Sequence, residues 1–162
     1  VGGAGVARPR LGEVPEAVAG LRIIELGGMS LDDLLHHYSP RPVTIHEPTI
    51  LIQVNKLYRH DMSPLELYEA TRGVWPLGTR RATAKFAIPV FHGVIRAIYR
   101  IDSWHPAAST PYATRTKRDV TWPGRWEFVG REASKALRSK YVGRSAEKHL
   151  HGDRFPVTYV NC

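Results

Sequence analysis

The sequence predicts an α+β domain, built as a small curved mixed sheet or an open β-barrel with two main flanking helices. Two observations lead to this prediction. Apolar runs and capped helical patterns follow one another in the order strand, helix, two strands as a hairpin, long loop, strand, helix, strand. Few of these connections suit a parallel crossover, which disfavours a doubly wound sheet. A chain of 162 residues is also long enough to bury one sizeable core.

The composition predicts a division of the chain near residue 48. Residues 1–20 are rich in Gly, Ala, Pro and Val without periodicity, and "MSLDDLLHHY" at 29–38 is typical of a short helix. Three prolines follow this helix and disfavour continued helix or strand. We therefore predict a flexible leader and connector with one short helix at 1–48, and a basic α+β domain at 49–162.

The first two elements of this domain are a strand and a helix. "TILIQVN" at 49–55 has the β-branched content of a buried strand. In the helix that follows, Ser63 is the expected N-cap, Pro64 takes the first helical position and Glu66 closes a capping box. Gly73 lies where a left-handed C-cap belongs. The helix is therefore expected to end just before "VW".

A β-hairpin is expected next, with "AKFAIPVF" and "VIRAIYRIDSW" as its strands and Gly93 in the turn. Strict alternation in the second strand puts one set of residues on a core face and the other set on a face that presents cations. The core set is Ile95, Ala97, Tyr99 and Ile101, and the other set is Arg96, Ile98 and Arg100. Pro89 predicts that the first strand lies at an edge or contains a bulge.

The last third of the domain begins with a long polar loop at 105–124 that carries a basic cluster. A strand at 125–130 follows, in which the alternation of Trp126 and Phe128 favours a core position for both. We expect a helix over about 131–141, then a turn and a closing strand in "FPVTYVNC".

The charge of the chain points to a polyanionic partner. The formal net charge is +8, and Lys and Arg outnumber Asp and Glu by 19 to 9 in residues 49–162, against 4 to 6 in residues 1–48. Such an excess favours nucleic acid, because cations that neutralise phosphates release condensed counterions. No apolar run approaches the roughly 18 residues of a membrane span. The single cysteine, Cys162, fits a reducing compartment, so we expect a cytoplasmic protein without a membrane partner.

Tryptophans and cations are interleaved in this basic domain, a mixture that suits stacked bases and held phosphates. Trp75 and Trp104 each lie beside a secondary-structure end and are predicted either to stack on a ligand or to plug the core. Arg72 and Asn55 are possible polar contacts, although Arg72 equally suits the helix dipole and Asn55 a turn. The predicted phosphate-binding residues are Arg80, Arg81, Lys85, Arg96, Arg115, Lys117 and Arg118.

The sequence contains no complete catalytic motif. Lys85, Asp102 and His105 are speculative participants in an alternative function, a small nuclease or nucleotide hydrolase. The eight histidines lack the spacing and the Cys or Glu partners of a metal site, so neither a metal nor another cofactor is expected. A third alternative is a protein-interaction module whose basic face binds an acidic partner.

Several blocks in order, including "LYEATRGVW", "GVIRAIYRIDSWHPA", "RWEFVGREAS" and "FPVTYVNC", resemble a bacterial module found downstream of GIY-YIG-type nuclease domains. The resemblance covers most of 45–162 and implies an associated nuclease domain or protein, without nuclease activity in this chain. The element order is also similar to the PUA-like superfamily, including EVE- and ASCH-like domains. That likeness implies a nucleic-acid-binding module. A reader of modified bases or of single strands is one form that such a module can take.

Overall fold

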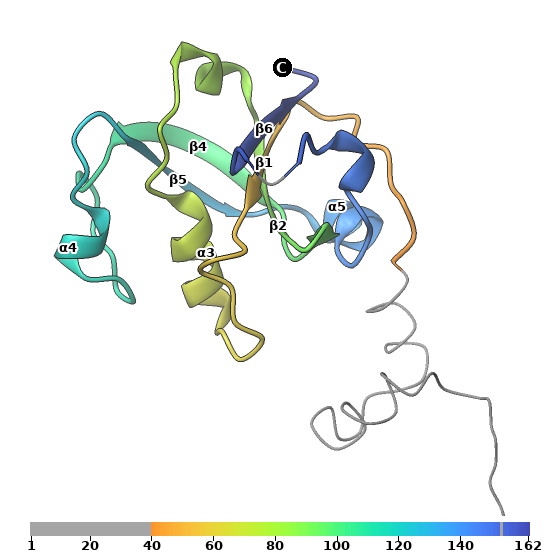
Figure 1. Cartoon of the computed structure of the whole chain (residues 1–162), viewed down its shortest axis with the longest axis horizontal. Coiled ribbons are helices and arrows are strands. Elements are labelled where there is room, and N and C mark those ends of the chain that lie inside the picture. Colours follow the sequence, from red (N-terminus) through yellow and green to blue (C-terminus); the bar gives the residue numbers. More distant parts are fainter. Residues whose placement is uncertain (1–39, 153) are drawn as a thin grey trace, which may run out of the picture. The chain divides into compact units, whose positions relative to one another are not determined.

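An open mixed sheet forms the centre of the domain (Figure 1). Its strands are β1 (Thr49–Gln53), β2 (Phe86–Phe91), β3 (Val94–Ile95), β4 (Tyr99–Pro106), β5 (Trp126–Glu132) and β6 (Val157–Val160). The order across the sheet is β5-β4-β2-β1-β6, and β3 pairs with β2. β1 and β2 are parallel, and the other pairs are antiparallel. This mixed, unclosed sheet with helices beside it confirms the predicted α+β class.

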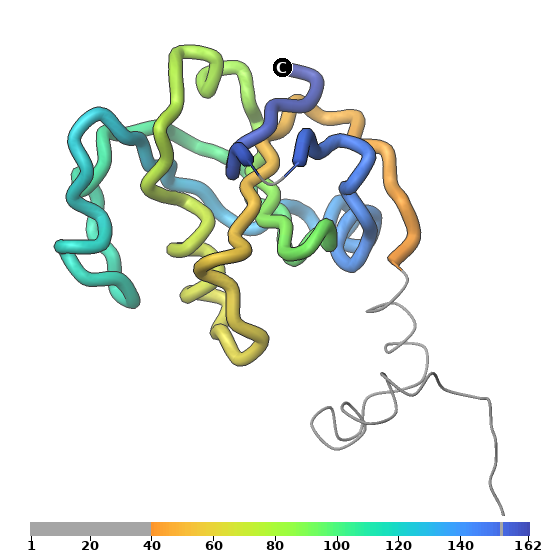
Figure 2. The backbone as a smooth tube through the Cα atoms, in the orientation of Figure 1, coloured from red at the N-terminus to blue at the C-terminus, as the bar shows by residue number. Residues whose placement is uncertain are grey.

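The computed structural model describes residues 40–152 and 154–162. The helix predicted at 29–38 and most of the predicted leader lie outside the described residues. Residues 40–48 belong to the same compact unit as the sheet: Ile45 is buried in the core, and its N–H donates to His149 Nε2 at 3.1 Å. The tube in Figure 2 shows the C-terminal strand returning to run beside β1, close to this entry segment.

Both faces of the sheet are buried, because apolar residues alternate between two clusters along β1. Ile50 and Ile52 belong to the cluster that includes Leu67 of α3 (Pro64–Arg72), whereas Leu51 belongs to the cluster that includes Leu137 of α5 (Lys135–Tyr141). Successive side chains of a strand point to opposite faces of the sheet, so a strand that is covered on both faces needs apolar residues at consecutive positions. The two predicted flanking helices thus cover the two faces.

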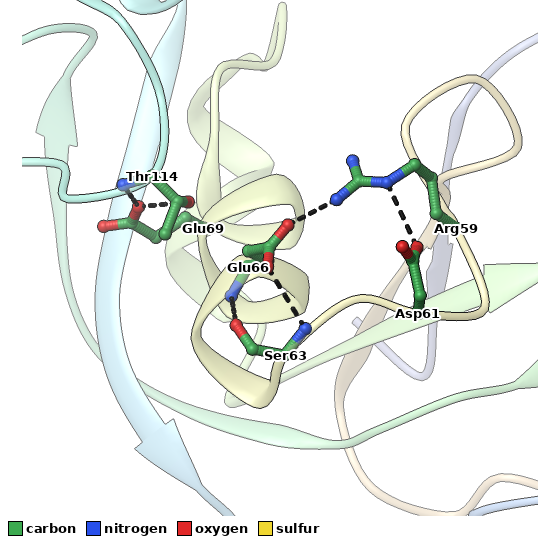
Figure 3. Close-up of polar contacts among 6 residues, drawn as sticks. All are labelled: Arg59, Asp61, Ser63, Glu66, Glu69 and Thr114. Carbon is green, nitrogen blue, oxygen red and sulfur yellow. Dashed lines mark hydrogen bonds and ion pairs between the residues drawn. The ribbon is translucent and has the colours of Figure 1, made fainter.

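α3 begins and ends where predicted, but the conformation of its C-cap differs from the prediction. Ser63 Oγ accepts from the Glu66 N–H at 3.1 Å, and the Glu66 carboxylate reaches back to the Ser63 N–H (Figure 3). Gly73, predicted as a left-handed C-cap, is extended with φ −176°. A Cβ there would collide with the Tyr112 hydroxyl and lie 2.9 Å from Glu127 Cβ. Gly73 is thus the C-cap, as predicted, but the predicted left-handed conformation was wrong, and glycine is needed there for close packing.

The predicted hairpin exists, but its second strand is broken. β3 and β4 both pair with β2 and are separated at residues 96–98. The break reverses the alternation: Ile95 and Ile98 join one core cluster, while Ala97 and Tyr99 join the other. The prediction of one core face and one cationic face was therefore wrong. β2 is an interior strand, so Pro89 is not at an edge; it lies opposite the break, where its carbonyl accepts from the Arg96 N–H at 3.0 Å.

The connection between β4 and β5 contains a helix that the sequence pattern did not predict, α4 (Lys117–Val120). Thr116 and Asp119 form a capping box around it. We call residues 107–125 the anchored loop; its ends are tied by the bond from the Ala107 N–H to the Arg125 carbonyl at 2.9 Å. β5 also runs to Glu132, so α5 begins later than predicted. The described residues also include two short 3₁₀ helices, at Thr79–Thr83 and Glu147–His149.

Candidate nucleic-acid interface

Two adjoining cavities lie between α3, the segment that follows β1, and the anchored loop. Their volumes are about 400 Å³ and about 500 Å³, within the range of about 300–1,000 Å³ typical of ligand sites. They share Leu57, Arg115, Asp119 and Trp122. We call the two cavities together the groove, the first the β1 cavity and the second the α3 cavity.

Trp122 stands at the junction of the two cavities and is 49% exposed. The guanidinium of Arg125 lies 4.5 Å from its ring centroid, a cation–π distance. An indole that is half exposed between two cavities is available for stacking, since most large apolar side chains of a domain are covered. Sequence reasoning noted Trp122 only as part of an aromatic and basic cluster. Its exposure depends on the anchored loop and has no local signal.

The two tryptophans predicted as stacking walls lie in different surroundings. Trp75 lines the β1 cavity, and its Nε1–H donates to the Thr71 carbonyl at 2.7 Å. Trp104 lies in β4, lines neither cavity of the groove, and packs edge-on against Phe128 with ring centroids 5.5 Å apart. Trp75 is therefore a fixed part of the groove wall, and Trp104 is part of the apolar packing.

Cations outnumber carboxylates around the groove. Among the residues that the structure describes, its lining carries six Lys and Arg residues and two acidic residues, a net charge of +4. One of the six, Arg59, is paired with Glu66 at 2.5 Å (Figure 3). The cations are Lys56, Arg59, Arg115, Arg118, Arg125 and Arg154. Four of these, Lys56, Arg59, Arg125 and Arg154, were not among the phosphate-binding residues predicted from sequence. The lining attracts anions, because a concave site of one sign focuses the field.

Of the predicted phosphate-binding residues, Arg115 and Arg118 line the groove, and Lys117 is exposed beside them on α4. Arg115 also donates to the Gly73 carbonyl, so part of its guanidinium is used within the fold. Asn55 lines the β1 cavity, and its Oδ1 accepts from the His92 N–H at 3.0 Å. The two predicted roles of Asn55 were a ligand contact and the capping of a turn. Its side chain accepts from the turn at His92, which matches the second role.

The other four predicted phosphate-binding residues do not line the groove. Arg80 is exposed and its guanidinium lies 4.8 Å from the Tyr159 ring centroid, while Arg81 stacks 3.3 Å from the Trp126 ring centroid. Lys85 is exposed just before β2. Arg96 is half-buried over Tyr58, and its burial lowers the pKa of the guanidinium.

Arg72 is buried and is engaged by the anchored loop. Its guanidinium donates to Thr110 Oγ1 at 2.6 Å and to the Pro111 carbonyl at 2.5 Å, and it lies 3.7 Å from the Tyr112 ring centroid. Only 3% of Arg72 is exposed. The side chain thus holds the fold together instead of facing a ligand, as the predicted polar contact would require.

Two buried carboxylates hold the same loop and were missed by sequence reasoning. Glu127 Oε1 accepts from the N–H groups of Ser109 and Thr110 at 2.8 and 2.9 Å. Glu69 accepts from the N–H groups of Ala113 and Thr114; the bond to the Thr114 hydroxyl, at 2.6 Å, appears in Figure 3. These hydrogen bonds are partly buried, although most of the loop is exposed. Backbone N–H groups turned toward the protein need acceptors, and a carboxylate can satisfy several at once.

The pKa values of both carboxyl groups lie below the ordinary range. Burial alone raises the pKa of Glu69, but the hydrogen bonds from Thr114 and Ala113 outweigh burial. Burial likewise raises the pKa of Glu127, and the polar contacts from Tyr112 and Thr110 outweigh it. Both groups are therefore charged at neutral pH, as acceptors of several N–H donors should be.

The speculative catalytic residues do not meet in the groove. Asp102 is exposed and pairs with Arg131 at 3.7 Å, and His105 Nε2 lies 2.8 Å from Ser103 Oγ. Neither residue lines the groove, and Lys85 does not line it either. Within residues 40–152 and 154–162, no group of three His, Cys, Asp or Glu residues is arranged to hold a metal ion. In the same part of the chain no helix has both the length and the apolarity needed to cross a membrane.

Comparison of the chain with models of protein families, with curated proteins and with solved structures finds no match. The resemblance to a module downstream of GIY-YIG nuclease domains therefore stays a prediction.

Proposed function

We propose that this domain binds single-stranded nucleic acid in the groove, with a base stacked on Trp122. The observation that carries the proposal is a half-exposed indole between two adjoining cavities whose lining has a net charge of +4. An indole can stack only on a base that is unpaired or turned out of a duplex, while Lys and Arg hold the backbone. Lys56, Arg125 and Arg154 supply those cations beside the β1 cavity.

We also propose a PUA-like architecture for the domain. The mixed, open sheet with α3 on one face and α5 on the other supports this assignment, which began from the element order. An associated nuclease domain or protein is part of the same proposal. Neither depends on nuclease activity in this chain, and the groove contains none of the three speculative catalytic residues.

The test is a fluorescence anisotropy titration with short single-stranded and duplex DNA and RNA of matched sequence. Single strands should bind more tightly than duplexes. With about three phosphates neutralised, the slope of log affinity against log salt should be about −2 between roughly 50 and 200 mM salt. No binding at low salt, or binding without salt dependence, would sink the proposal.

Two arginine variants separate the groove from the general charge of the domain. Arg125→Ala should weaken binding and reduce the salt slope by about 0.7. Arg138→Ala removes the same charge from α5, where Arg138 pairs with Glu132 at 2.6 Å, and should leave both quantities unchanged. Equal losses in the two variants would mean diffuse binding. Binding of acidic proteins without single strands would instead favour the protein-interaction alternative.

A further inference from the structure

The anchored loop supplies the part of the groove that carries Trp122, and it lies on α3 and β5 through polar contacts. Its ends meet at the Ala107 to Arg125 hydrogen bond of 2.9 Å. Between these ends it is joined to Glu127 near its start and to Glu69 further along. The two attachment points lie before α4, and Trp122 comes directly after this short helix.

The two carboxylates provide most of the acceptors in this contact. Glu127 is fully buried and Glu69 is 3% exposed. Glu127 Oε1 accepts from two backbone N–H groups and from the Thr110 hydroxyl at 3.1 Å. Glu69 accepts from two backbone N–H groups and from the Thr114 hydroxyl. If either carboxylate is lost, partly buried N–H donors lose their acceptor, and an unsatisfied donor costs more than an exchanged hydrogen bond.

Two arginines complete the contact and connect it to the groove. Arg72 donates to Thr110 Oγ1, the same hydroxyl that donates to Glu127. Arg115 donates to the Glu69 carbonyl at 3.3 Å and also lines both cavities. Buried carboxylates are tolerated only when such donors and charges surround them. Arg115 therefore both fixes the loop and lines the groove.

We propose that Glu69 and Glu127 are positioning residues: they touch no ligand themselves, but they hold the anchored loop so that Trp122 stands at the junction of the two cavities. The inference rests on the proposed function for its effect on binding. The holding of the loop can be measured without any ligand.

Amide hydrogen exchange tests the holding directly. In Glu69→Gln the amides of Ala113 and Thr114 should exchange about tenfold faster, because their common acceptor loses its charge. In Glu127→Gln the amides of Ser109 and Thr110 should respond first. Glu132→Gln is the matched control, since Glu132 lies on the same strand but is exposed and pairs with Arg138. Unchanged exchange at 109–114 in both variants would overturn the proposal.

A signal from Trp122 separates positioning from general destabilisation. With 5-fluorotryptophan incorporated, the Trp122 resonance should shift or broaden in Glu69→Gln, while that of Trp104 keeps its wild-type position. Equal changes in both would show a loosened fold and contradict the proposal. Thr114→Val, which removes one hydroxyl donor and keeps the carboxylate, should give a smaller change of the same kind if Glu69→Gln fails to fold.

Affinity gives the functional readout. Both glutamine variants should bind single strands about five- to tenfold more weakly, with the salt slope kept, because the groove cations remain. Wild-type affinity in variants whose 109–114 amides exchange faster would show that the loop does not position the binding site. If the wild-type domain binds no nucleic acid, the proposed function fails, whereas the exchange pattern still decides whether the carboxylates hold the loop.

Discussion

The two sides of the groove are held in different ways. The sheet meets α3 through apolar side chains such as Ile50, Ile52 and Phe128, all fully buried. The anchored loop meets α3 and β5 through Glu69, Arg72 and their hydrogen bonds. Apolar burial is additive and tolerant of small shifts, whereas a buried polar network loses much when one member is removed. We infer that the first contact sets the fold and the second sets the site.

The largest expected effect is on the apolar side. Phe128→Ala removes a fully buried ring that packs against Tyr68 and Trp104. The free energy of unfolding should fall by about 3–5 kcal/mol, the usual cost of truncating a core aromatic side chain. Urea denaturation measures this change. A loss below about 1 kcal/mol would contradict the role of this cluster as the main support of the fold.

The second largest effect on stability is expected at Gly73, which lies between the end of α3 and the anchored loop. In Gly73→Ala the new methyl group collides with the Tyr112 hydroxyl and lies 2.9 Å from Glu127 Cβ. A loss of about 1–3 kcal/mol in the free energy of unfolding is expected from overpacking.

Gly78→Ala is the matched control for that glycine. No atom lies within 4 Å of its added Cβ, and φ is −87° there, so the stability should stay within about 0.5 kcal/mol. If both alanine variants change the free energy of unfolding by a similar amount, close packing is not the reason that position 73 needs glycine.

Acid should weaken the polar contact selectively. The pKa values of Glu69 and Glu127 are lowered in the folded protein, so their stabilisation is present above the ordinary value of 4.5 and is lost as the pH falls below it. The charged or titratable groups around them are Arg72 from α3 and Tyr112 and Arg115 from the loop. The loss should be smaller than for Phe128→Ala, because a neutral carboxyl group keeps an acceptor oxygen.

The measurement is the free energy of unfolding at pH 3 to 7 for wild type and for the Glu69→Gln, Glu127→Gln double variant. The difference between them should be largest at neutral pH and should shrink in acid. A difference that stays constant with pH would show that the charge of these groups does not stabilise the loop.

The smallest effect on stability, with a large effect on binding, is expected for Trp122→Ala. An exposed side chain at a loop contributes little to folding, so the free energy of unfolding should change by less than about 0.5 kcal/mol. Loss of a stacked base should cost about 1–3 kcal/mol in binding, roughly tenfold or more in affinity. Wild-type affinity in this variant would remove Trp122 from the site.

The apolar side could be predicted from sequence because its signals are local. The apolar, β-branched run of β1 spans only a few consecutive residues. The two residues of the capping box, Ser63 and Glu66, are likewise close together in the chain. The broken second strand of the hairpin could not be predicted, since it depends on how β2 pairs with two separate segments.

The polar side joins residues far apart in the chain, and sequence patterns therefore missed most of it. Glu69 reaches donors 44 and 45 residues away. Arg72 was predicted either to contact a ligand or to complement the helix dipole. Its position in the last helical turn gives no sign of the loop residues that it contacts. Trp122 lines both cavities and is half exposed, whereas Trp104 lies in β4 and packs against Phe128. Only the fold makes one of them a groove residue.

The most direct test of the account uses the four indole N–H signals of the ¹⁵N-labelled domain during titration with a single-stranded oligonucleotide. Assignment by single Trp→Phe variants identifies each signal. The account predicts the largest shift for Trp122, a smaller one for Trp75 and none for Trp104. A shift centred on Trp104 with an unmoved Trp122 signal would contradict it.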